Sequence, residues 1–327
     1  MVKKALALLI LFNTTATASY RPDRLLGDQF EQLQLNMSDD YSGRVVATLV
    51  RPTSQPVSER AILYIHGFND YFFQRELAEQ FTSHGYRFYA LDLRKYGRSI
   101  LPENNIFELR DITEYDEEID RAIEIITSEG GGDITIMGHS TGGLVATLYA
   151  HHHRDRVDRV ILNSPFFDMN NTPFLDNVLI PIVAAYAKIA PCTKIPMGSS
   201  TAYAESLLKE HQGEWSFDTS LKFSPSPPME SSWLRAIYLA HREVQSIRDL
   251  DIPILLLYSD KSVHDDEWSE EFQYADSVLD VEDIKHYGSQ LGSQVTSAQI
   301  VGAMHDIILS APEIRANAYN VIFDWLD

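Results

Sequence analysis

The sequence predicts an α/β fold in which a mostly parallel sheet is covered by helices on both faces. Two patterns support this class: short apolar runs alternate with helix-like segments from residue 30 onward, and a glycine-rich turn links one such run to the next helix. The 327 residues are 44% hydrophobic and 23% charged, which suits a soluble globular protein with a sizeable core.

The individual elements are assigned from hydrophobic period and length. A short continuous apolar run is typical of a buried parallel strand, whereas apolar residues three or four apart indicate a helix. Strands are therefore predicted at 30–37, 44–50, 61–65, 87–91, 134–137, 157–162, 253–258 and 295–301. Helices are predicted at 76–84, 112–128, 144–151, 284–291 and 311–326.

The interval 165–247 interrupts this alternation. It contains a proline-rich stretch at 224–228 and helix-like pieces at 178–189 and 231–245. Helices inserted between two strands of a sheet would lie over the strand ends. We interpret 165–247 as a lid insertion within one domain spanning residues 19–327.

The N-terminus has the layout of a secretory leader. Lys3 and Lys4 precede an apolar run at 5–12, and Ala16 to Ala18 form an A-x-A cleavage site. The run is far shorter than the roughly 20 residues that span a bilayer, so no stable membrane span is expected. Residues 1–18 are predicted to be removed from a secreted or periplasmic protein, with a cytoplasmic protein as the alternative.

The charge and the cysteine count exclude some classes of function. A formal net charge of -20 argues against nucleic-acid binding, which requires a basic surface. With a single cysteine, Cys192, the chain can form neither an intramolecular disulfide nor a Cys-rich zinc site.

The strongest motif is Gly138-His139-Ser140-Thr141-Gly142, between the predicted strand 134–137 and the helix that follows. G-x-S-x-G in this context is the nucleophile elbow of the α/β-hydrolase fold. The glycines permit a tight turn that lifts the serine hydroxyl out of the sheet. Ser140 is the predicted nucleophile.

Two further loops complete the expected site. The loop after strand 61–65 begins His66-Gly67-Phe68, and in this fold that loop supplies one oxyanion-hole N–H. We assign the two donors to the backbones of Phe68 and Thr141. The base should follow the last strand, and among eleven histidines His305 alone lies in a glycine-bearing loop between that strand and the final helix.

At this point the chain resembles the monoacylglycerol lipase and lysophospholipase branch of the α/β-hydrolases, which includes serine aminopeptidase-like members. The matching pieces are Ile-His-Gly at 65–67, Asp-Leu-Arg-Lys-Tyr-Gly-Arg-Ser at 92–99, the elbow, and Gly-Ala-Met-His-Asp at 302–306. Family members usually read D-L-R-G-H-G-R-S in the second piece, so Lys95 and Tyr96 depart from the pattern.

The acid of the triad has two candidates. Asp260 comes directly after strand 253–258, where an acid is expected. The resemblance implies instead a D-x-V-V pattern, which Asp276-Ser277-Val278-Leu279 matches after an apparent insertion at 261–275. Asp276 lies 29 residues before His305, a spacing close to that of the family, so Asp276 is the first choice and Asp260 the second.

The expected activity is hydrolysis of carboxylic esters through an acyl-enzyme, with no metal or organic cofactor. The resemblance implies monoacylglycerol- or lysophospholipid-type substrates, and apolar lid residues such as Tyr186 and Trp233 could line an acyl pocket. One alternative is a serine aminopeptidase of the same fold, whose substrate amine Glu205, Glu210 or Glu214 could bind. The other is a hydrolase-fold binding protein with an inactive site. The oligomeric state is left open.

Overall fold

The structure is a computed structural model that describes residues 19–169, 175–198, 200–265 and 267–327. The predicted leader, residues 1–18, lies outside the described residues, as does Phe174 of the lid insertion. Within the described ranges no helix combines the length and the apolar character that a membrane crossing requires.

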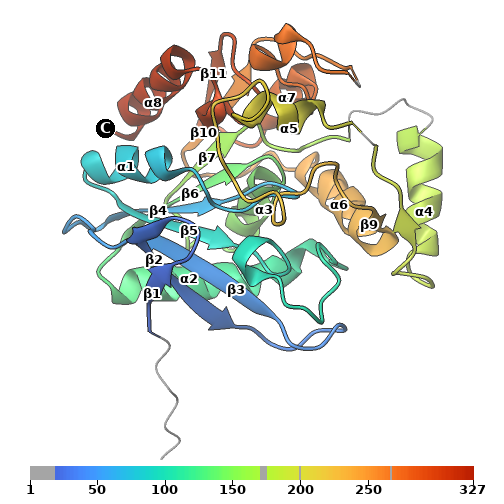
Figure 1. Cartoon of the computed structure of the whole chain (residues 1–327), viewed down its shortest axis with the longest axis horizontal. Helices are drawn as coiled ribbons and strands as arrows, with labels where there is room; N and C mark the ends of the chain where they lie inside the picture. The colour runs from blue at the N-terminus through green and yellow to red at the C-terminus, as the bar shows by residue number, and fades with distance from the viewer. Residues whose placement is uncertain (1–18, 170–174, 199, 266) are drawn as a thin grey trace, which may run out of the picture.

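The described residues build one sheet of nine strands, which runs through the centre of the molecule (Figure 1). The spatial order is β1-β2-β3-β5-β4-β6-β7-β10-β11. Neighbouring strands from β5 to β11 are parallel, whereas the pairs β1–β2, β2–β3 and β3–β5 are antiparallel. The bounds are β1 Arg21–Asp23, β2 Gly27–Asn36, β3 Val46–Pro52, β4 Arg60–Ile65, β5 Arg87–Asp92, β6 Asp133–His139, β7 Arg159–Asn163, β10 Ile254–Ser259 and β11 Val295–Ile300.

Helices cover both faces of the sheet, so the predicted class is confirmed. Leu77 of α1 and Ile322 of α8 pack into one apolar core, whereas Ile119 of α2 and Ile284 of α7 pack into the other. The central strands have both faces buried, which explains why their sequences read as continuous apolar runs. The helix bounds are α1 Arg75–Ser83, α2 Asp116–Ser128, α3 Thr141–His152, α7 Val281–Gly288 and α8 Pro312–Leu326.

Residues 165–247, which the sequence predicts to be a lid insertion, lie between β7 and β10 in the chain. The outer part of this insertion lies beyond the ends of the strands, with α4 at the periphery (Figure 1). Its last helix, α6, packs against α4 but also against α3, and Trp233 and Ile237 of α6 belong to the main core. α6 therefore connects the lid insertion to the helical layer of the body. The bounds are α4 Ile180–Tyr186, β8 Lys194–Ile195, α5 Ala202–Leu207, β9 Met229–Glu230 and α6 Ser231–Val244.

Candidate active site

Ser140 occupies a strained turn between β6 and α3. It adopts φ 51° and ψ −118°, a region that a residue with a side chain rarely occupies. The turn is tight because β4 lies against it: a Cβ at Gly142 would be 2.3 Å from the carbonyl oxygen of Ile65. Only glycine fits there, and the turn sets Ser140 at the N-terminus of α3, where partial positive charge favours an anion.

His305 and Asp276 form a buried pair. Nδ1 of His305 lies 2.9 Å from Oδ2 of Asp276, and the two side chains are 3% and 0% exposed. Oδ1 of Asp276 accepts hydrogen bonds from the backbone N–H groups of Val278 and Leu279 at 2.9 and 2.8 Å. A carboxylate held in this way assigns the proton of the neutral imidazole to Nδ1 and leaves Nε2 as the basic nitrogen.

The segment after β10 explains how Asp276 reaches this position. The chain leaves at Lys261 and later returns beside its own start, where the N–H of Asp276 donates to the carbonyl of Lys261 at 2.9 Å. Asp276 therefore stands next to the end of β10 despite its late place in the sequence. Asp260 has a different partner, since its Oδ1 accepts from the N–H of Gly302 at 2.6 Å.

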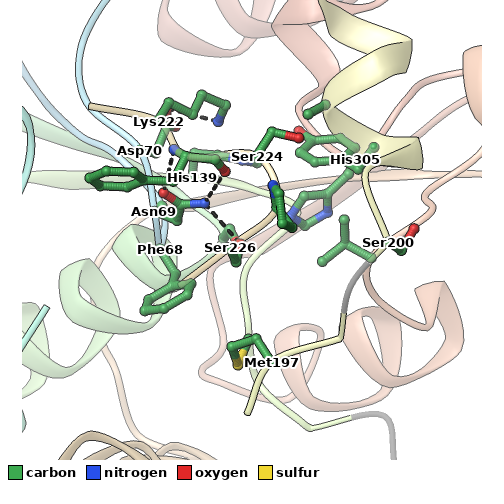
Figure 2. Close-up of a pocket in the computed structure, with 17 residues that line it drawn as sticks. Phe68, Asn69, Asp70, His139, Met197, Ser200, Lys222, Ser224, Ser226 and His305 are labelled. Carbon is green, nitrogen blue, oxygen red and sulfur yellow. Dashed lines mark hydrogen bonds and ion pairs between the residues drawn. The ribbon is translucent and has the colours of Figure 1, made fainter. Parts of the chain in front are cut away.

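Ser140 and His305 line one cavity of about 260 Å³. The loop after β4 forms one wall of it, and the lid insertion forms another through Tyr203 and Lys222. Figure 2 shows His305 and the lid residues around this space, with Phe68 on the side of the β4 loop.

Two backbone amides next to Ser140 are available as donors. Phe68 comes from the β4 loop, and Thr141 is the first residue of α3. Neither N–H donates a hydrogen bond to any other part of the described chain. The β4 loop runs very close to Ser140, because a Cβ at Gly67 would lie 3.1 Å from Cβ of Ser140. These two N–H groups can donate hydrogen bonds to the negative oxygen of a tetrahedral intermediate.

A buried ion pair joins the lid insertion to the β4 loop. Nζ of Lys222 lies 2.9 Å from Oδ1 of Asp70, and the side chains are 9% and 2% exposed (Figure 2). Oδ2 of Asp70 and the hydroxyl of Tyr203 have no hydrogen-bond partner within the described residues. Sequence reasoning missed this part of the site, because no local motif connects two residues 152 positions apart.

His139 contributes a second imidazole next to His305. The two ring centroids are 4.8 Å apart. Burial lowers the pKa of His139, so it is neutral at physiological pH and adds no positive charge beside His305. Tyr203 meets His305 edge-on from the lid side at 5.8 Å, and burial raises the pKa of its hydroxyl.

One group of buried side chains has the donor types of a metal site. The ligand atoms of Asp70, His139 and Asp306 all lie within 4.8 Å of one another. Two of the three already have close partners. Lys222 donates to Asp70, and the side-chain amide of Asn163 donates to Oδ1 of Asp306 at 2.7 Å. Asp70 and Asp306 therefore already belong to a hydrogen-bond network of protein side chains.

Several lid residues do not reach the cavity. The apolar lid residues named as candidates for an acyl pocket, where described, are absent from its lining; Tyr186 is 51% exposed, and Trp233 instead packs on Phe68 at 4.6 Å between ring centroids. The lid carboxylates do not line it either. Glu205 accepts a hydrogen bond from Thr201, and Glu214 pairs with Arg315.

Comparisons with known proteins agree with this architecture. The family profile described as "Serine aminopeptidase, S33" matches residues 57–311. The structure is similar to that of a soluble variant of monoglyceride lipase from Saccharomyces cerevisiae, solved with a substrate analog, with a TM-score of 0.63 and 16% identity over 97% of each chain. It is also similar to the monoacylglycerol lipase of Paleococcus ferrophilus, with a TM-score of 0.63 and 18% identity over 86% of this chain and 98% of that one.

A curated relative matches a smaller part. Epoxide hydrolase 3 of Xenopus tropicalis is 33% identical over 109 residues, which is 32% of this chain. The match spans 27% of the length of that relative. At these identities the solved structures establish the fold alone, and the family profile establishes the membership.

Proposed function

This chain belongs to the hydrolase family described as serine aminopeptidase, S33, and we propose that it is a serine hydrolase that cleaves neutral carboxylic esters of the monoacylglycerol type. The observation that carries the proposal is the buried hydrogen bond between Asp276 and His305 at the edge of the cavity that Ser140 lines.

In this proposal Ser140 is the nucleophile and His305 is its base. Nε2 of His305 takes the hydroxyl proton as Oγ of Ser140 attacks the ester carbonyl, and the same imidazole then gives the proton to the departing alcohol. Asp276 orients the ring through Nδ1 and stabilises the imidazolium that forms. His305 next activates water, which releases the acid from Ser140.

The backbone N–H groups of Phe68 and Thr141 are proposed to hold the oxyanion. Each donor of this kind contributes about 2.7–4 kcal/mol to stabilisation of the transition state in well-studied enzymes. Thr141 begins α3, and Phe68 lies three residues after the end of β4, where the loop packs closely against Ser140, so little reorganisation is needed as charge develops.

The charge of the cavity favours a neutral ester over a substrate with a free amine. Asp70 is the one carboxylate among the described lining residues, and the Lys222 ammonium already neutralises it. An incoming substrate ammonium would have to approach Lys222 and compete with it for Asp70. Glu205, Glu210 and Glu214 do not line the cavity, so the aminopeptidase alternative lacks a free carboxylate among the described lining residues.

An apolar face on the lid insertion supports a lipid-type ester. The exposed fractions of Leu179, Ile182, Tyr186 and Ile189 are 44%, 60%, 51% and 86%. All four lie on or beside α4. Several large apolar side chains exposed together are typical of a surface that meets lipid or another apolar partner. The similar solved proteins named as monoglyceride and monoacylglycerol lipases point to the same substrate class.

Labelling with a fluorophosphonate probe tests the reaction type. We expect wild-type protein to be labelled. The Ser140→Ala variant should remain unlabelled although its free energy of unfolding equals that of wild type. Absence of wild-type labelling would favour the hydrolase-fold binding protein. A panel of p-nitrophenyl esters, monoacylglycerol, lysophospholipid and aminoacyl amides tests the substrate class, and turnover of the amides alone would favour the aminopeptidase.

A further inference from the structure

Asn163 lies between the turn that carries Ser140 and the loop that carries His305. It is the last residue of β7, between β6 and β10, and it is 0% exposed. Its backbone carbonyl accepts a hydrogen bond from the N–H of Ser140 at 3.0 Å and lies 3.2 Å from Nδ1 of His139. The main chain of Asn163 is thus attached to the strained turn.

The side chain of the same residue binds the loop that carries His305. Its Nδ2 donates to Oδ1 of Asp306 at 2.7 Å, and its Oδ1 accepts from the N–H of Ile307 at 3.2 Å. Asp306 and Ile307 are the two residues that directly follow His305. Asn163 therefore contacts both loops. Its backbone carbonyl binds the turn at Ser140, and its side-chain amide donates one hydrogen bond to the loop that carries His305 and accepts one from it.

We propose that Asn163 is a positioning residue that sets the nucleophile Ser140 relative to its base His305. This inference rests on the proposed function. Asn163 does not line the cavity, so it acts on the reaction through the two loops that it joins. A displacement of about 1 Å between a nucleophile and its base can cost on the order of 100-fold in rate.

The chemistry of Asp306 explains why an amide is required at position 163. Asp306 is 1% exposed, and its Oδ2 has a long contact of 3.4 Å with Nε2 of Gln74. The Asn163 amide supplies the short hydrogen bond to this buried carboxylate. A carboxylate at position 163 would face another carboxylate at hydrogen-bond distance, and like charges so close repel.

This complementarity allows a rescue experiment in the full-length protein. Asn163→Asp keeps the size of the side chain and an acceptor for Ile307 but loses the donor to Asp306. The double variant Asn163→Asp with Asp306→Asn exchanges donor and acceptor and restores the hydrogen bond. We expect Asn163→Asp to lower kcat for an ester about 10- to 100-fold with KM changed less than threefold, and we expect the double variant to recover at least half of that loss on a logarithmic scale.

The split between kcat and KM gives a readout that a purely structural role would not move. A displaced base slows the reaction of the bound substrate, so kcat normalised to folded protein should fall while KM stays nearly constant, and the double variant should recover kcat. Ser164→Ala is the matched control, because it removes a neighbouring buried hydroxyl that has no partner within the described residues. We expect this control to retain wild-type kcat.

The outcomes separate this inference from the proposed function. If Asn163→Asp retains wild-type kcat while Ser140→Ala is inactive, the inference is wrong and the proposed function stands. If Ser140→Ala retains activity, the proposed function itself fails. Should the single variant not fold, the double variant decides: recovery of folding with near-wild-type kcat supports the inference, and a folded but slow double variant overturns it. Failure of both to fold would assign Asn163 to global stability and also overturn it.

Discussion

Nδ1 of His305 lies 2.9 Å from Oδ2 of Asp276, so the imidazole of the last loop is held by a carboxylate 29 residues earlier in the chain. Both groups are buried, and Asp276 accepts two further hydrogen bonds from its own backbone segment. The orientation of the proposed base therefore depends on a turn that begins and ends beside β10.

Replacing the proposed acid should affect catalysis far more than replacing its neighbour Asp260. Asp276→Asn removes the negative charge and allows the wrong tautomer of His305, so kcat for an ester should fall about 10³- to 10⁴-fold. Asp260→Asn keeps an acceptor for the N–H of Gly302, and its kcat should fall less than tenfold. Steady-state kinetics of the two variants make the comparison. A larger loss in Asp260→Asn would mean that the acid is misassigned.

A methyl group at Gly67 should displace Ser140. An added Cβ would lie 3.1 Å from Cβ of Ser140 and 3.2 Å from Cδ2 of His139, both tighter than ordinary contacts. We expect Gly67→Ala to lower kcat about 10- to 100-fold, because the β4 loop and Ser140 must move apart. Gly132→Ala is the control, since its added Cβ meets nothing within 4 Å. Equal activity of both variants would contradict the close approach.

Removing the lysine of the cavity should change substrate preference as well as stability. Lys222→Met leaves Asp70 buried without its counter-ion, which should lower the free energy of unfolding by about 3 kcal/mol. The unpaired carboxylate should then attract a substrate ammonium. We expect the ratio of kcat/KM for an aminoacyl ester to that for a neutral ester of equal length to rise about tenfold.

The control for this prediction is a lysine whose removal does not alter the cavity. Lys194 pairs with Glu230 but is 52% exposed at its side chain and does not line the cavity. Lys194→Met should leave the substrate ratio unchanged. A ratio that stays constant in Lys222→Met would show that Asp70 does not interact with the charge of the substrate.

His241 should make the fold sensitive to acid. Burial lowers the pKa of His241 from 6.5 to about 3, so between these values the unfolded chain binds a proton that the folded chain does not. The contribution of this group to stability is complete above pH 6.5 and is lost as the pH falls toward 3, by about 1.4 kcal/mol per pH unit.

The measurement is chemical unfolding between pH 7 and pH 4. His241→Gln keeps a donor for the carbonyl of Phe166 but cannot titrate. As the pH falls, the free energy of unfolding of this variant should decrease less steeply than that of wild type. The difference between the two slopes should correspond to about one proton taken up on unfolding. Parallel pH dependences in the two proteins would contradict the assigned pKa direction.

The fold and part of the site could be predicted because their signals are local. The strand at 61–65 and the strand at 253–258 are continuous apolar runs, and the structure has β4 and β10 there. Gly142 and the strained backbone of Ser140 belong to a pentapeptide whose geometry a few neighbouring residues enforce. The choice of His305 as the proposed base followed from chain order, since the base of this fold is expected in the loop after the last strand.

The choice between Asp260 and Asp276 depended on more than local sequence. The resemblance favoured Asp276, but the path of residues 261–275 had no periodic pattern from which to read it. In the structure a backbone hydrogen bond between Asp276 and Lys261 returns the chain to β10. Apolar periodicity does not encode such a return.

The amino-acid sequence by itself determined the alternation of the main strands and helices, the turn at Ser140 and the two loops expected beside it. The tertiary structure decided which carboxylate meets His305, that Lys222 of the lid neutralises Asp70, and that Asn163 binds both loops. The physical reason is the range of the interactions. Backbone strain and hydrophobic period act over a few residues, whereas pairs separated by 29, 143 or 152 residues form only when separate segments pack together.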